Sequence, residues 1–160
     1  LFDYMTVEQN VMFPLNLLTK QSSSEKLNRV NFCLERVNLK KANNLMPSEL
    51  SGGMTKRVAI ARAIAMNPKY LFCDEPNSGL DPQTSGLIDG LINEITKEFK
   101  ITTIVNTHDM NSVLKIGDNI AYIYNGKIWW NGTKDEILNS KNNELQEFIF
   151  ATELTRRLLK

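Results

Sequence analysis

The stretch Tyr70-Leu71-Phe72-Cys73-Asp74-Glu75 decides the fold, because a short apolar run ends there in two adjacent carboxylates. An uninterrupted apolar run of this length predicts a strand that is covered on both faces. A β-branched run from Ile101 to Val105 predicts a second buried strand. Between the two strands, apolar residues at helical spacing predict a helix: Leu87, Ile88, Leu91, Ile92, Ile95 and Phe99. This order predicts an α/β fold with a right-handed βαβ unit and a parallel sheet.

Upstream of these strands the sequence predicts helices. Thr6 and Gln9 form a capping-box pattern, and the apolar residues that follow reach Leu18 with an interruption at Pro14. A second helix is predicted after a serine cluster, by an apolar stripe at Leu27, Val30, Leu34 and Val37. A buried helix is predicted from Val58 to Met66, stopped by Asn67-Pro68.

Downstream, the pattern predicts a short helix near Asn111–Ile116 and a strand near Ile120–Tyr124. The pair Asn125-Gly126 predicts a two-residue hairpin turn, so Lys127–Trp130 is expected to pair back antiparallel. A further capping box begins at Thr133, and an amphipathic helix is predicted in the tail from Glu144 to Leu159.

Composition argues against several classes of protein. The 160 residues carry 19 Lys and Arg against 18 Asp and Glu, a net charge of +1 that gives no global field for nucleic acid. No apolar run approaches the ~20 residues that cross a membrane. Cys33 and Cys73 lie among apolar neighbours, which favours buried thiols over a disulfide.

The glycine turn, Leu50-Ser51-Gly52-Gly53-Met54, precedes the Val58 helix. Two glycines allow close approach of a ligand to the backbone, and a helix N-terminus offers free N–H groups to a phosphate. The same residues also fit a flexible loop with Ser51 as the N-cap, and local spacing does not decide between the two interpretations.

Asp74 and Glu75 come at the carboxyl end of a parallel strand, where open α/β sheets bind ligands. One carboxylate can hold Mg²⁺ through water while the other deprotonates an attacking water. A solvated strand end is the alternative. His108, the only histidine, follows the second strand and is a candidate phosphate sensor, although a lone histidine is more often structural. Asp81 fits a helix cap as well as a functional loop.

In chain order, these patterns resemble the nucleotide-binding domain of ABC transporters. The resemblance covers the signature motif (50–54), the Walker B strand (70–74) with Glu75, the D-loop (78–81) and the switch His108. It implies a partial RecA-like P-loop NTPase sheet with an α-helical ABC subdomain and with the P-loop strand missing. It also implies ATP and Mg²⁺ as cofactors.

The resemblance further implies roles for matching residues. Asp74 would help hold Mg²⁺, Glu75 would be the catalytic base and His108 would contact the γ-phosphate. Ser51, Gly52 and Gly53 would bind the same phosphate across a homodimer, and Asp81 would couple the two sites. Met54 in place of the family's usual glutamine, together with the LSGGM-x-x-R run, looks like Mce/Mla-type lipid-transport ATPases, which implies lipid transport.

The sequence contains no G-x-x-x-x-G-K-[ST] motif. We therefore expect residues 1–66 to be the helical subdomain, 67–132 the later part of the RecA-like core and 133–160 a helical extension. We expect this chain alone to be a fragment that neither binds Mg-ATP tightly nor hydrolyses it, and to self-associate through an exposed sheet edge and apolar surface.

The leading hypothesis is that the chain is part of the ATP-hydrolysing subunit of a membrane transporter. Its expected partners are permease subunits and not nucleic acid. The subunit is expected in the cytoplasm, bound to the inner face of the cell membrane. A soluble ABC ATPase of chromosomes or ribosomes is the alternative. A third possibility is a non-enzymatic interaction module, against which Glu75 and His108 argue weakly.

Overall fold

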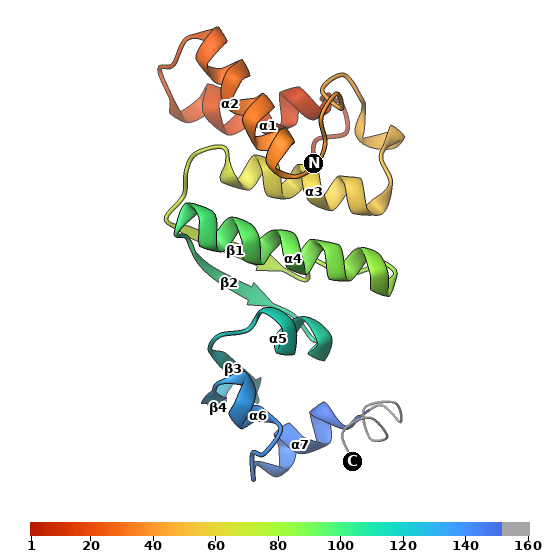
Figure 1. Cartoon of the computed structure of the whole chain (residues 1–160), viewed down its shortest axis with the longest axis vertical. Coiled ribbons are helices and arrows are strands. Elements are labelled where there is room, and N and C mark those ends of the chain that lie inside the picture. The colour runs from red at the N-terminus through yellow and green to blue at the C-terminus, as the bar shows by residue number, and fades with distance from the viewer. Residues whose placement is uncertain (152–160) are drawn as a thin grey trace. The chain divides into compact units, whose positions relative to one another are not determined.

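Three helices precede the first strand in the computed structural model, which describes residues 1–151 (Figure 1). They are α1 (Val7–Leu18), α2 (Ser23–Arg36) and α3 (Gly52–Ile64), and a short 3₁₀ helix, η1 (Pro47–Glu49), precedes α3. The capping box of Thr6 and Gln9 is confirmed. Pro14 lies inside α1 without ending it, because the lost backbone hydrogen bond is offset by burial of the stripe Val7, Val11 and Leu15.

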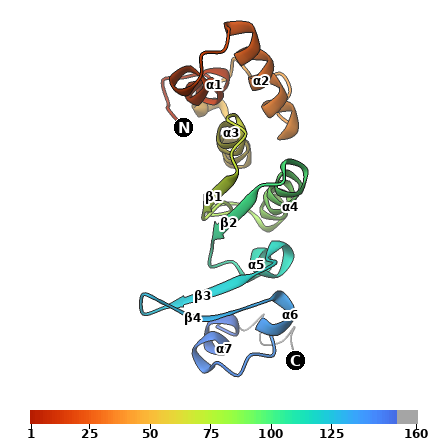
Figure 2. The ribbon, with the colours of Figure 1, turned by 90° about the vertical axis from the view of Figure 1, so that its left-hand side faces the viewer.

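The βαβ unit predicted from the sequence is confirmed. Strands β1 (Tyr70–Asp74) and β2 (Thr102–Asn106) pair in parallel, with Phe72 opposite Ile104 and Asp74 opposite Asn106. Helix α4 (Pro82–Phe99) connects them and lies beside the two strands (Figure 2).

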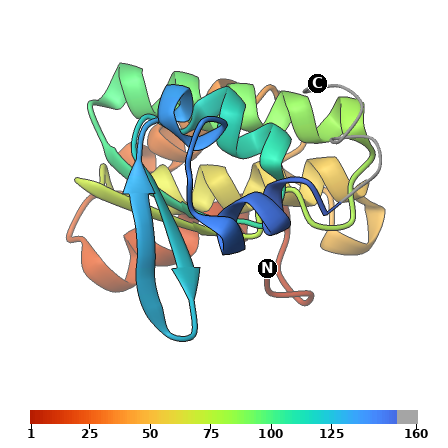
Figure 3. The same cartoon turned by 90° about the horizontal axis from the view of Figure 1, so that it is seen from below.

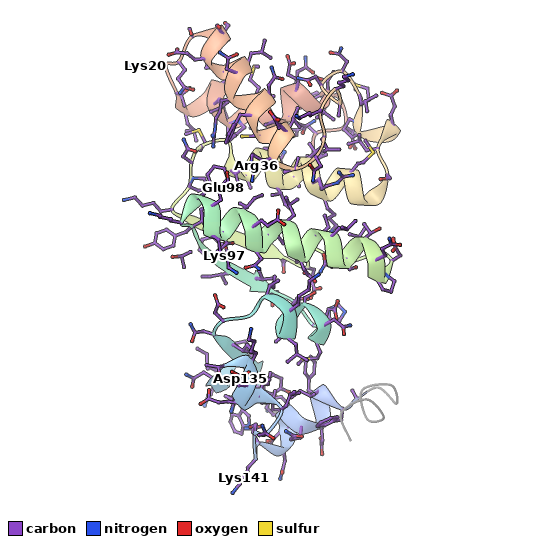
Figure 4. All side chains as sticks on the ribbon, viewed as in Figure 1. Lys20, Arg36, Lys97, Glu98, Asp135 and Lys141 are labelled. Atoms are coloured by element: carbon purple, nitrogen blue, oxygen red, sulfur yellow. The ribbon has the colours of Figure 1, made fainter. Side chains whose placement is uncertain are left out.

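Helices α2, α3 and α4 share a buried apolar core in the first of two compact units, Leu1–Asn106. Its fully buried side chains include Val30, Cys33, Leu34, Val58, Ile64, Ile88, Ile92 and Ile95. On the surface, Arg36 of α2 points toward Glu98 of α4 and forms an ion pair with it (Figure 4). Arg57 of α3 donates hydrogen bonds to the backbone carbonyls of Val37 and Asn38 at the end of α2.

The prediction that both strands are covered on both faces is wrong. Leu71 and Thr103 face α4, where the Thr103 hydroxyl lies 2.6 Å from that of Thr96. On the opposite face the side chains of Tyr70, Phe72 and Ile104 are 62%, 72% and 52% exposed. A strand is covered on both faces only where the sheet has a second layer, and among residues 1–106 only the α4 face has one.

We expect this exposed face to drive self-association of the isolated chain. Phe72→Thr keeps a residue type that favours strands but removes the most exposed aromatic ring of the face, and should shift the chain toward monomers in light scattering. Leu87→Gln is the matched control, because Leu87 is exposed to a similar extent but lies on α4. Equal association of both variants and the wild type would contradict the role of the sheet face.

The second unit begins at Thr107. It contains α5 (Met110–Ile116), the antiparallel hairpin β3 (Ile120–Tyr124) and β4 (Lys127–Gly132), α6 (Lys134–Ile137) and α7 (Asn143–Ile149) (Figure 3). Asn125 and Gly126 both have positive φ, at 48° and 71°, as a type I′ hairpin turn requires. The core is formed by Ile137, Leu145 and Ile149. The predicted tail helix is confirmed only over residues 144–149, because α7 ends at Ile149, and residues 152–160 lie outside the described part.

Both cysteines are free thiols. Cys33 is buried and Cys73 is partly buried, and burial raises the pKa of each thiol. Within residues 1–151 no helix is both long and apolar enough to cross a membrane.

Candidate functional site

The glycine turn forms the N-terminus of α3. Ser51 is the N-cap, and its Oγ accepts a hydrogen bond from the Met54 N–H at 3.3 Å. The Thr55 hydroxyl donates to the Ser51 carbonyl at 3.1 Å. Ser51 and Gly52 are exposed. The N-cap interpretation of Ser51 is therefore confirmed, and it leaves the N-terminal N–H groups of α3 at the surface, where an anion is favoured.

The two glycines of the turn lie close to the end of the loop that follows Glu75 and to the first turn of α4. A Cβ on Gly53 would lie 2.7 Å from the Thr84 Cγ2, and one on Gly52 would lie 3.3 Å from the Leu80 Cδ2. The structure thus brings the glycine turn and residues 80–84 together, and glycine is required at 53 by this close approach.

Asp81 is the N-cap of α4. Its Oδ1 accepts hydrogen bonds from the N–H groups of Gln83 and Thr84 at 3.0 Å each, and its Oδ2 accepts one from the Thr84 hydroxyl. The hydrogen bonds from Thr84 hold the pKa of the Asp81 carboxyl below its usual value. The capping role weighed from the sequence is confirmed.

The acidic pair lies at the carboxyl end of β1. Asp74 is exposed, and its Oδ1 accepts a hydrogen bond from the Asn106 Nδ2 on β2 at 2.7 Å. Glu75 is half-buried and has φ +44°, a left-handed conformation that non-glycine residues rarely adopt. Strain of this kind concentrates at functional sites.

Three hydrogen bonds hold the backbone of Glu75. Its N–H donates to the Asn106 carbonyl at 2.8 Å, and its carbonyl accepts from the Ser78 N–H at 3.2 Å. The same carbonyl accepts from the Lys56 Nζ on α3 at 3.2 Å. The strand end is therefore tied both to the neighbouring strand and to the helix that carries the glycine turn.

The loop after Glu75 is anchored by a buried polar contact. The Asn77 Nδ2 donates to the Asp89 Oδ1 of α4 at 2.7 Å, and the two residues are 7% and 2% exposed. This contact fixes the path of the chain between the acidic pair and Asp81.

His108 belongs to the second unit and is exposed, just before the α5 N-cap Asp109. The site of the first unit therefore consists of the glycine turn, the acidic pair and the Asp81 cap. Over the described residues, 1–151, no three His, Cys, Asp or Glu side chains gather as ligands for a metal.

Sequence reasoning missed Lys56, Thr84 and Asn106. Each acts through a contact across the fold, at separations of 19 residues for Lys56 with Glu75 and 32 for Asn106 with Asp74. The alignment of Asp74 with Asn106 follows from the parallel register, so the two predicted strand ends were the one signal that pointed to Asn106.

Residues 1–78 match the family model described as ABC transporter. The ATP-binding cassette MJ0796, solved as a dimer bound to ADP and Pi, is 34% identical with a TM-score of 0.74, over 84% of this chain and 59% of that one. Over residues 1–78 in sequence, and in its fold, the chain is similar to the ABC transporter ATP-binding domains. Its α/β fold is that of an ABC ATPase, as predicted.

Curated relatives of the chain include methionine import ATP-binding proteins. That of Carboxydothermus hydrogenoformans is 41% identical over 98% of this chain and 50% of the relative. That of Bacillus subtilis is 39% identical over 90% and 42%. The chain thus spans about half the length of these relatives. The assignment to the Mce/Mla lipid type, made from Met54 and the LSGGM-x-x-R run, is not supported, because these relatives are methionine import proteins.

Proposed function

We propose that the chain is part of the ATP-hydrolysing subunit of a membrane transporter. The observation that carries the proposal is Glu75, held in a strained conformation next to Asp74 and bonded to the helix of the glycine turn. A phosphate-binding turn and a water-activating carboxylate in one unit fit phosphoryl transfer to water.

The donors at the strand end fit Mg²⁺. Mg²⁺ is usually held by one or two carboxylates together with waters and substrate phosphates. Asp74 offers an exposed carboxylate with one oxygen oriented by Asn106, so it would hold the ion, which supplies positive charge to the β- and γ-phosphates. Glu75 would accept the proton of the attacking water as general base.

The remaining roles rest on the family resemblance. Ser51, Gly52 and Gly53 would present hydroxyl and N–H donors to the γ-phosphate held by a second subunit in a homodimer. His108 would contact the γ-phosphate of the nucleotide held by its own subunit, and Asp81 would couple the two sites. The dimeric form of the cassette MJ0796 supports this arrangement.

We infer methionine as the cargo, because the relatives named above are methionine import proteins. The partners would be permease subunits, and the subunit would lie on the inner face of the cell membrane. The division into residues 1–66, 67–132 and 133–160 remains a proposal beside the two compact units described here.

Uptake of labelled methionine tests this function. Cells that lack the gene for the full protein should take up methionine slowly, and the wild-type gene should restore uptake while a Glu75→Gln gene should not. Normal uptake in the deleted cells would contradict the cargo. ATP hydrolysis by the purified full protein that is not coupled to methionine transport would also contradict methionine as the cargo. It would not contradict the assignment as an ATPase.

A further inference from the structure

Lys56 lies on α3, in the first turns after the glycine turn, and its side chain reaches the end of β1. The ammonium Nζ donates a hydrogen bond to the Glu75 carbonyl at 3.2 Å, and the side chain is half-buried. Hydrogen bonds from a charged donor are roughly twice as strong as neutral ones, and partial burial reduces competition from water.

Lys56 contacts the peptide of Glu75, whose backbone has an unfavourable left-handed conformation. Glu75 has φ +44°, although a residue before a proline favours an extended conformation with negative φ. Pro76 follows and is buried. A left-handed non-glycine residue costs about 1–3 kcal/mol and persists only where its surroundings hold it.

Of the three hydrogen bonds that hold this peptide, two are backbone bonds to the neighbouring strand and loop. The bond from Lys56 comes from a side chain, and it originates on the helix of the glycine turn. Removal of the Lys56 ammonium therefore loosens the Glu75 peptide without altering the turn or the strand pairing.

We propose that Lys56 is a positioning residue that fixes the backbone of Glu75 from the α3 helix, so that the carboxylate is aimed at the attacking water. This inference rests on the proposed function of Glu75. A general base must lie within hydrogen-bond reach of the water, and a misplacement of about 1 Å costs up to about 100-fold in rate.

Lys56→Met in the full protein tests the proposal, because methionine keeps the length of the side chain and removes the donor. We expect kcat for ATP hydrolysis to fall about 10-fold with an unchanged KM for ATP, and Lys56→Arg to restore most of it. Lys97→Met is the matched control on α4, and should leave both constants unchanged. If the thermal midpoint shows that Lys56→Met does not fold, Lys56→Gln takes its place.

A double-mutant cycle with Glu75→Gln separates positioning from a general structural effect. If Lys56 acts through Glu75, Lys56→Met lowers kcat in the wild type but adds no loss to the Glu75→Gln variant. Equal losses in both backgrounds, or a wild-type kcat for Lys56→Met, would overturn the role of Lys56 while the ATPase function stands. Wild-type turnover by Glu75→Gln would instead remove the proposed base, and the Lys56 proposal with it.

Discussion

Glu75→Gln lowers ATP turnover of the full protein by at least about 100-fold and leaves ATP binding intact, because the amide cannot accept the proton of the attacking water. The glutamine keeps the shape of the side chain, and the backbone bonds to Asn106, Ser78 and Lys56 are unchanged by the substitution. Turnover is measured as phosphate release, and binding by titration with Mg-ATP.

Glu94→Gln provides the control. It makes the same chemical change at an exposed position of α4, away from the strand end, and should leave turnover within about twofold of the wild type. Loss of ATP binding together with turnover in Glu75→Gln would point to a binding role for Glu75 and would count against the general-base assignment.

Features set by neighbouring residues could be predicted from the sequence. The Asn125-Gly126 turn and the caps Thr6 and Asp81 depend on residues within four positions, and all were confirmed. The pairing of β1 with β2 was predicted because the handedness of a βαβ crossover leaves few topologies.

Features set by distant residues could not be predicted. Apolar patterning shows that Phe72 is suited to burial, but it does not show whether a layer packs on that face, and in this chain Phe72 is exposed. The bond of Lys56 to Glu75 depends on the placement of α3 against the strand end, which no local pattern specifies. A single residue type, Met54, was too little to assign the cargo.

Gly53→Ala should destabilise the first unit by about 1–3 kcal/mol and lower turnover at least about 10-fold, because the new methyl group would lie 2.7 Å from the Thr84 Cγ2. Thr84 can move aside only by giving up the hydrogen bond from its hydroxyl to Asp81. The clash therefore affects the glycine turn and the α4 cap together. Thermal unfolding and phosphate release measure the two effects.

Two further variants test whether the contact with Thr84 causes the stability loss of Gly53→Ala. Thr84→Ser removes Cγ2 but keeps the hydroxyl donor, so Gly53→Ala combined with Thr84→Ser should recover most of the lost stability. Gly90→Ala makes the same change inside α4, where the added Cβ meets nothing within 4 Å, and should stabilise the protein by about 0.5–1 kcal/mol. Glycine-to-alanine substitution thus changes the free energy of unfolding in opposite directions at the two positions. Helix propensity favours alanine at both, but only at Gly53 would the added methyl group meet a neighbouring side chain. A stabilising Gly53→Ala, or a double variant no more stable than Gly53→Ala alone, would show that the contact with Thr84 is not what requires glycine in the turn.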